Sequence, residues 1–175
     1  MKEFIIQTPR LGLRPWLDSD IEPFYSMSQD DDVMRYLPSK YSLEQCKLVK
    51  EKINQRYEDF GYCLYAAEHL ESGSFIGWLG IQNFQFPWLD SVEIGWRIDK
   101  KYWDQGLTTE GANAVLKHSF EELKLKQIFS FTTLDNLASE RVMQKIGMDH
   151  IGEFEHPSLE EGHRLRRHCL YLMGG

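Results

Sequence analysis

The sequence has no apolar run that approaches the ~18 residues of a membrane-spanning helix, which argues against a membrane protein or a membrane partner. Its first ten residues, MKEFIIQTPR, lack the apolar segment of a secretion signal. The three cysteines, Cys46, Cys63 and Cys169, form no C-x-x-C pair, so the pattern indicates neither a disulfide framework nor a zinc site. We therefore expect a cytoplasmic protein without a bound metal.

Positive charge is also scarce, because 20 Lys and Arg residues are outnumbered by 27 Asp and Glu residues, giving a net charge of −7. Nucleic acids bind basic surfaces, so this balance argues against nucleic acid as the main partner, whereas an amine-bearing substrate is compatible with it. Hydrophobic residues make up 42% of the chain, which is an ordinary globular proportion. With no linker or repeat in view, we expect residues 1–175 to form a single domain.

Alternating apolar residues, helix caps and glycines predict about seven strands and four helices along the chain. The strands are expected at residues 4–16, 62–68, 75–82, 92–98, 128–133, 148–155 and 167–172, and the helices at 18–27, 42–60, 109–123 and 136–147. Residues 83–90, NFQFPWLD, are expected to form an aromatic loop. This order predicts a mixed α/β fold in which helices cover both faces of a central sheet.

The stretch VEIGWRIDKKYWDQGLTTE, from Val92 to Glu110, predicts a strand, a loop and the start of a helix. Apolar residues alternate up to Ile98, so Glu93 lies on the opposite face of the strand. Between Asp104 and Thr109, backbone N–H groups reach a helix start, where they lack intrahelical partners and favour an anion. Gly106 leaves the backbone open to a ligand. Neither G-x-x-x-x-G-K-[ST] nor G-x-G-x-x-G occurs, so amides and hydroxyls alone would hold a phosphate.

A second strand also leads into a helix start. The β-rich run IFSFTT ends at Thr133, Asn136 suits an N-cap, Ser139 falls in the first turn, and Gly147 is a stop signal. Taken singly, Asn136 and Ser139 have a purely structural explanation as cap and first-turn residues. Two such corners in one chain favour a binding site between them.

These two motifs, YWDQGLTTEG and NLASERVMQKIGM, resemble those of the GNAT superfamily of acetyl-CoA-dependent N-acetyltransferases. The subgroup that the chain resembles most contains the ribosomal-protein N-terminal acetyltransferases. The resemblance extends through TPRLGLRPW near the start and EIGW in the middle to nearly the whole chain. It implies a mostly antiparallel sheet that splays open between its fourth and fifth strands, here those containing Val92 and Ile128, with the cofactor in the gap.

The resemblance also implies acetyl-CoA as co-substrate and assigns its contacts residue by residue. The strand that pairs with the pantetheine arm falls on Trp96, Arg97 and Ile98, the pyrophosphate loop on Asp104, Gln105, Gly106, Leu107, Thr108 and Thr109, and a further contact on Asn136. The loop departs from the family pattern [QR]-x-x-G-x-[GA], because Trp103 stands in the first place and Thr108 in the last. A threonine there narrows the approach to its own amide, but its hydroxyl can donate to a phosphate oxygen.

Acetyl transfer from a thioester to an amine needs a base, a proton for the departing thiolate and donors for an oxyanion. Glu93 is the candidate base, acting directly or through a water, and its alternative is a surface or salt-bridged glutamate. Ser139 is the candidate acid, a role that the family gives more often to a tyrosine; Tyr102 and Tyr171 have no spacing that singles them out. Backbone N–H groups near Arg97 and Ile98 are candidate oxyanion donors.

The sequence therefore predicts an N-acetyltransferase that moves the acetyl group of acetyl-CoA to a primary amine by direct attack in a ternary complex. The acceptor is left open between a protein N-terminus and a small molecule, because a fold does not decide its substrate. A non-catalytic acyl-CoA-binding or interaction module with the same fold is the alternative. The oligomeric state, including a homodimer, is also left open.

Overall fold

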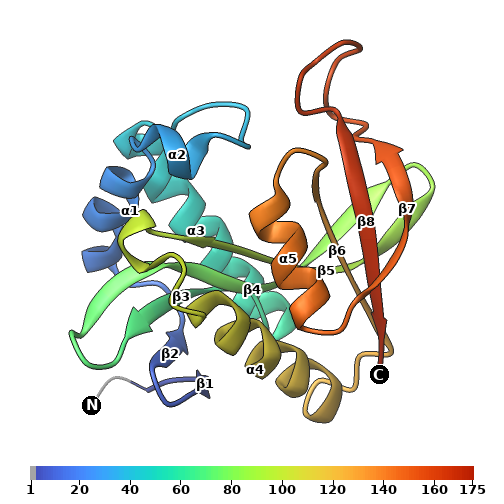
Figure 1. Ribbon diagram of the computed structural model, residues 1–175. Helices are drawn as coiled ribbons and strands as arrows, with labels where there is room; N and C mark the ends of the chain where they lie inside the picture. Colours follow the sequence, from blue (N-terminus) through green and yellow to red (C-terminus); the bar gives the residue numbers. More distant parts are fainter. Residues whose placement is uncertain (1–2) are drawn as a thin grey trace.

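The computed structural model describes residues 3–175, and its central feature is one eight-stranded mixed sheet (Figure 1). The strands lie in the order β1-β2-β3-β4-β5-β6-β8-β7. They are β1 (Ile6–Gln7), β2 (Leu11–Arg14), β3 (Leu64–His69), β4 (Ser74–Phe86), β5 (Leu89–Ile98), β6 (Gln127–Thr133), β7 (Asp149–Glu155) and β8 (Arg167–Gly174). All neighbouring strands are antiparallel except β5 and β6.

The seam between β5 and β6 is where the sheet opens. The two strands share a single register pair, Glu93 with Phe129, whereas β4 and β5 stay paired over the whole length of β5. One step further, the Ser130 hydroxyl donates to the Ile94 carbonyl at 3.0 Å in place of a backbone amide. Beyond this point β5 has no strand partner on its β6 side, which confirms the predicted splay between the Val92 and Ile128 strands.

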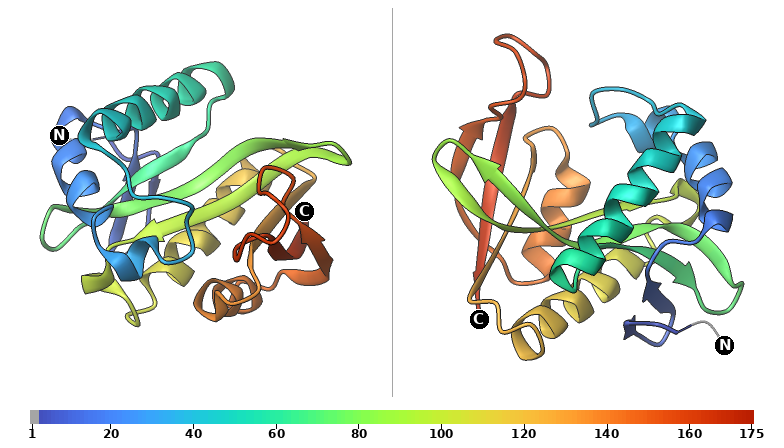
Figure 2. Two further views of the ribbon diagram at one scale, coloured as in Figure 1. Left: turned by 90° about the horizontal axis from the view of Figure 1, so that it is seen from above. Right: turned by 180° about the vertical axis from the view of Figure 1, so that it is seen from behind.

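Five helices cover the sheet, and in Figure 1 α1 and α2 lie above its β4–β5 part while α4 lies below it. They are α1 (Ile21–Met27), α2 (Asp31–Met34), α3 (Leu43–Phe60), α4 (Leu107–Glu121) and α5 (Leu137–Lys145). Figure 2 shows from behind that α3 crosses the outside of the strands. The side chains of β5 show the two faces, because Arg97 packs near Phe24 of α1 and Met34 of α2, while Trp96 contacts Ser139 of α5.

Local signals set the ends of the longest helix. Ser42 caps α3 by accepting from the Gln45 amide, and the Gln45 side chain accepts in return from the Ser42 amide. Gly61 ends the helix in the left-handed conformation, with φ of 76°. The predicted helix 42–60 is therefore confirmed. α4 begins at Leu107, two residues earlier than the sequence suggested.

Two expectations about strands were wrong. The predicted first strand, 4–16, is a hairpin of β1 and β2, because the chain turns at residues 8–10 and the Thr8 amide donates to the Leu11 carbonyl at 2.9 Å. The sheet accordingly has one strand more than the seven expected. The predicted loop 83–90 is mostly strand, since β4 and β5 remain paired up to Phe86 and Leu89 around a turn at Pro87 and Trp88.

The described part of the chain offers no helix that is both long and apolar enough to span a bilayer. Within the same residues, no group of three or more His, Cys, Asp or Glu side chains is arranged to hold a metal ion.

Candidate active site

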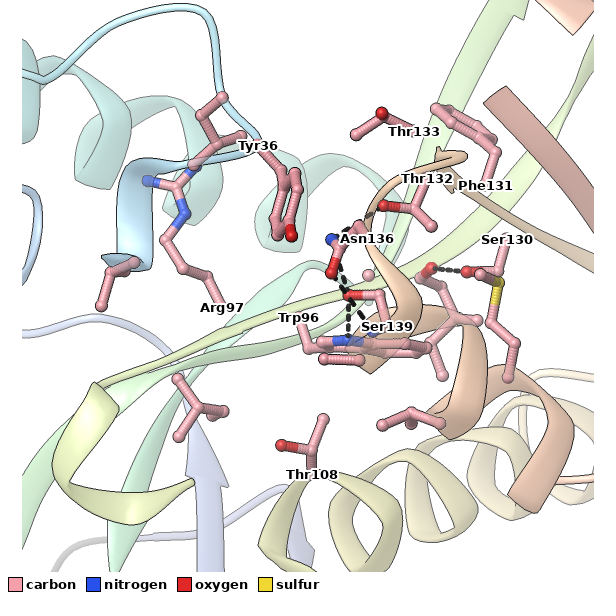
Figure 3. A pocket seen from close by; sticks show the side chains of 18 of the residues that line it. Tyr36, Trp96, Arg97, Thr108, Ser130, Phe131, Thr132, Thr133, Asn136 and Ser139 are labelled. Carbon is pink, nitrogen blue, oxygen red and sulfur yellow. Dashed lines mark hydrogen bonds between the residues drawn. The ribbon is translucent and has the colours of Figure 1, made fainter. Parts of the chain in front are cut away.

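A cavity of about 860 Å³ occupies the open seam and reaches residues on both faces of the sheet. The C-terminal half of β5, the start of α4 and the start of α5 form its walls, together with α2, the segment after α2 and the β7–β8 connection. Figure 3 shows the cavity with Tyr36 and Arg97 on one side and Asn136 and Ser139 on the other. All of the predicted cofactor-contacting residues except Gln105 line it.

The start of α4 presents backbone amides to this cavity. Gly106 is the N-cap, adopts φ of 75°, and offers no side chain to the first amides of the helix. The first intrahelical bond runs from the Glu110 amide to the Gly106 carbonyl, so the amides of Leu107, Thr108 and Thr109 precede the helical ladder. Leu107 takes part through its backbone, because its side chain is buried in the core. The corner therefore offers unpaired donors at the positive end of a helix.

Arg10 holds this corner from outside the cavity. Its guanidinium donates to the Gln105 carbonyl at 2.9 Å and to the Glu110 carboxylate at 2.7 Å. The Gln105 side chain turns back and donates to the Lys101 carbonyl at 3.0 Å, which explains why Gln105 does not line the cavity. The side chain of Gln105 therefore links the loop to the preceding turn.

The open edge of β5 provides a second set of backbone groups. Because successive residues of a strand alternate in direction, and the Ile94 carbonyl faces β6, the amides of Trp96 and Ile98 face the gap while that of Arg97 faces β4. The indole of Trp103, in the place where the family pattern has Gln or Arg, donates to the Ile98 carbonyl at 2.7 Å. Trp96 and Ile98 therefore offer the free donors on this edge.

Ser139 and Asn136 meet at the start of α5. Asn136 caps the helix by accepting from the Ser139 amide at 3.3 Å, and its amide group donates to Thr132 at 2.9 Å and to the Ser139 hydroxyl at 3.1 Å. The Trp96 indole also donates to that hydroxyl, at 3.3 Å (Figure 3). The Ser139 oxygen thus accepts two hydrogen bonds, which leaves its own proton free for a group in the cavity.

Glu93 lines the cavity from the face of β5 that carries α3. The Gln82 side chain donates to its carboxylate at 2.6 Å. Burial raises the pKa of Glu93 to about 7, against the smaller opposing effects of the Gln82 hydrogen bond and of Arg56. A carboxyl group that titrates near neutral pH inside a cavity has the properties of a general base. These properties favour the interpretation of Glu93 as a base over its alternative as a surface glutamate.

Tertiary packing brings further residues to the cavity. Tyr36 lies after α2, and Figure 3 shows its hydroxyl directed into the cavity towards Asn136. Gln82 comes from β4. His156 and His168 lie on the opposite wall with their ring centroids 5.0 Å apart, and burial lowers the pKa of each. Gln82 is placed by its register with Glu93, and Tyr36 by the packing of the segment after α2, neither of which a local pattern contains.

Of the two tyrosines considered in the sequence, Tyr102 and Tyr171, one lines the cavity and the other does not. Tyr102 lines the cavity. Tyr171 lies outside it, and its hydroxyl donates to Glu140 at 2.9 Å and accepts from Gln144 at 3.3 Å. Tyr171 is therefore occupied in a structural contact.

Comparison with known proteins identifies the fold and family. The chain matches the model of the acetyltransferase (GNAT) domain over residues 10–149. It is 31% identical over 152 residues to the uncharacterized N-acetyltransferase YnaD of Bacillus subtilis, covering 86% of this chain and 85% of that protein. A GNAT-family acetyltransferase from Bacillus anthracis has a similar structure, with a TM-score of 0.80, 27% identity and 97% of each chain covered.

The RimL ribosomal L7/L12 alpha-N-protein acetyltransferase, solved in complex with coenzyme A, shares the fold, with a TM-score of 0.81, 17% identity and 98% of each chain covered. The chain belongs to the GNAT acetyltransferase family, which confirms the resemblance seen in the sequence. It is an acetyl-CoA-dependent acetyltransferase.

Proposed function

We propose that this protein transfers the acetyl group of acetyl-CoA to a primary amine by direct attack in a ternary complex, with residues 1–175 acting as one catalytic domain. The observation that carries the proposal is a single cavity with a free strand edge, uncapped helix amides, a carboxyl group and a serine hydroxyl along its walls. Each supports one requirement of the reaction.

The co-substrate fits the two sets of backbone donors. The amides that precede the α4 ladder, with the hydroxyls of Thr108 and Thr109, suit a diphosphate. The free β5 edge at Trp96 and Ile98 suits the amide-containing pantetheine arm, as an added strand would. Acetyl-CoA supplies an activated thioester carbonyl, and an amide of the same edge is the candidate donor to its oxyanion.

Glu93 and Ser139 are proposed to move the protons. An acceptor α-amine has a reference pKa of about 8, so a base that titrates near 7 is well matched to remove its proton. The Ser139 hydroxyl, with both acceptor positions filled, is oriented to donate to the departing thiolate. The helix start beside it also stabilises negative charge on the sulfur. Tyr36 is the second candidate for this proton, because its hydroxyl points into the same space.

The test of the co-substrate site uses two glycines with matched backbone strain. Gly106→Ala forces a residue with a Cβ into φ of 75° at the α4 corner, and Gly61→Ala does the same at φ of 76° at the end of α3, where nothing lies within 4 Å of the added atom. Both variants should lose similar stability. At a ligand concentration of about 100 Kd, acetyl-CoA should raise the Tm of the wild type and Gly61→Ala by roughly 5–10 °C.

Gly106→Ala should lose most of that increase, because its methyl group and strain disturb the amides that receive the diphosphate. An equal Tm increase in all three proteins would contradict the placement of the co-substrate. Catalysis is then tested by measuring acetyl-CoA-dependent release of free CoA with a panel of primary amines and N-terminal peptides, and by determining product mass. Failure of every amine, with binding intact, would favour a binding module.

A further inference from the structure

Arg97 is a charged side chain in the cavity that the reaction chemistry above does not use. It leaves β5 on the face opposite Trp96 and extends towards α2, beside Tyr36 (Figure 3). Its guanidinium lies 5.3 Å from the ring centroids of Tyr41 and Trp78 and 5.9 Å from that of Phe24. An aromatic cage of this kind partly compensates a buried cation through the ring faces.

The aromatic cage leaves Arg97 without an anion. Among residues 3–175, no carboxylate forms an ion pair with it. Its guanidinium donates to the Met34 sulfur at 3.8 Å, a weak acceptor, and is hydrogen-bonded to the Tyr41 side chain. The carboxylate of Asp32, which also lines the cavity, is bonded to Lys100. An arginine keeps its charge in proteins, and Arg97 is half-buried in the cavity wall, so a carboxylate bound in the cavity would supply the counter-charge that the protein does not.

The arrangement of β5 separates this cation from the co-substrate. Trp96 and Ile98 present their side chains to the α4 and α5 face, where the diphosphate and thioester are proposed to lie, whereas Glu93 and Arg97 share the other face. Gly95 stands between these two and carries no side chain, and the Trp78 ring packs over it, 3.5 Å from where a Cβ would lie. Both Gly95 and Trp78 line the cavity. Arg97 and Glu93 therefore line the cavity on one face of β5, four residues or about 13 Å of strand apart.

We propose that Arg97 is a specificity residue that binds a carboxylate group carried by the acceptor amine, an inference that rests on the proposed function. One guanidinium matches the two oxygens and single charge of a carboxylate. The acceptor would place its amine towards Glu93 and its carboxylate at Arg97. Free amino carboxylates and peptides with an acidic residue near the N-terminus share this chemistry.

The experiment compares acceptors that differ only in that charge. Free amino acids are paired with their amides, and tetrapeptides with Asp or Glu in the second position are paired with the Asn or Gln peptides. Each pair is assayed with wild type, Arg97→Met, Arg97→Lys and the control Arg167→Gln, whose parent arginine is exposed and pairs with Glu153 at 2.7 Å. Methionine fills the site beside Met34 without charge, so a stable fold is expected, and melting curves check it.

Wild type and Arg167→Gln should prefer the carboxylate member of one series by about 30-fold or more in kcat/KM, the effect expected for a desolvated charged contact. Arg97→Met should abolish this preference, because the carboxylate and amide members then meet the same uncharged side chain. Arg97→Lys should retain part of the preference, because lysine keeps the positive charge but lacks the paired N–H donors of the guanidinium. The series that shows the preference distinguishes a free amino carboxylate from an acidic peptide.

Two results would overturn the inference: a wild-type preference for the uncharged members, or an unchanged carboxylate preference in Arg97→Met. If no amine is acetylated at all, the proposed function fails on its own. Arg97 is then tested by calorimetry of glutamate and glutamine against the protein saturated with CoA. Glutamate binding that Arg97→Met loses would support the carboxylate site, and equal or absent binding would refute it.

Discussion

The protonation of Glu93 makes the sharpest prediction, because it links stability and activity to the same group. Burial raises the pKa of this carboxyl group from 4.5 to about 7 in the folded protein. The unfolded chain therefore releases the proton at lower pH than the native state does. Stability falls as the pH rises from about 4.5 to about 7, and the full penalty remains above that range.

The size of this penalty follows from the same two values. A displacement of the pKa from 4.5 to about 7 corresponds to at most roughly 3.5 kcal/mol, at ~1.4 kcal/mol per pH unit. Glu93→Gln is neutral at every pH and its amide oxygen can still accept from Gln82. We expect the variant to match wild type at pH 4.5 and to melt several degrees higher at pH 8, as measured by thermal unfolding at both pH values.

Activity should change in the opposite direction. The kcat/KM of wild type should rise with pH through about 7, which gives the pH–rate profile a rising limb. Glu93→Gln should lose this limb, and its kcat/KM at pH 8 should be about 100-fold or more below that of wild type, the usual contribution of a general base. The profile is measured with two acceptors whose amine pKa values differ by about two units. A limb that belongs to the enzyme stays at the same pH with both acceptors, whereas a limb that belongs to the amine moves. Burial lowers the pKa of His156 and of His168 below the ordinary histidine value, so these two groups do not account for a limb near pH 7.

A neighbouring substitution checks the assignment. Gln82→Leu removes the hydrogen bond that favours the charged carboxylate, so the limb should move to higher pH by about one unit. The reasoning would be refuted if Glu93→Gln kept both the limb near pH 7 and a rate within threefold of wild type. In that case Glu93 would be a structural carboxyl group and another group would accept the proton.

Three further outcomes test the site and the fold. Ser139→Ala should lower kcat by tenfold or more, as a loss of proton donation requires, while Tyr171→Phe should keep wild-type kcat at temperatures well below its Tm; equal rates would remove Ser139 from the mechanism. Asp20→Ala should cost about 3 kcal/mol in urea unfolding, because it strips one partner from the buried Arg14, and a loss under 1 kcal/mol would contradict this. Ser42→Ala should cost about 1 kcal/mol by the same measurement through the lost cap of α3, and an unchanged midpoint would show that the cap is not needed.

Much of the fold was predictable because its signals are local. A capping box and a left-handed glycine determine the ends of α3, and alternation identified the core face of β5. The errors arose at two hairpins, where the pairing of neighbouring strands around a short turn decides the structure. Residues 83–90 contain a proline and polar residues that suggest a loop, yet the pairing of β4 with β5 extends both strands into this segment.

The candidate site divides in the same way. The α4 corner and the Asn136–Ser139 corner were predicted because each is a strand entering a helix start within a few residues. Tyr36 was missed, since its approach to the cavity depends on how the segment after α2 packs over β5. The direction of the Arg97 side chain followed from alternation, but the lack of an anion beside it required the packed structure.

The alternation of a single strand also explains how one cavity can hold two substrates without mixing their binding groups. On β5, the residues that face α4 and α5 are apolar and expose free backbone donors at the seam, which suits an uncharged pantetheine arm. The alternate residues are Glu93, Gly95 and Arg97, which present a carboxyl group, a bare backbone and a guanidinium in turn. This face suits a polar amine. Because the strand period is two, a one-residue shift would exchange these faces, and the register with β4 therefore fixes the separation of the faces proposed for donor and acceptor.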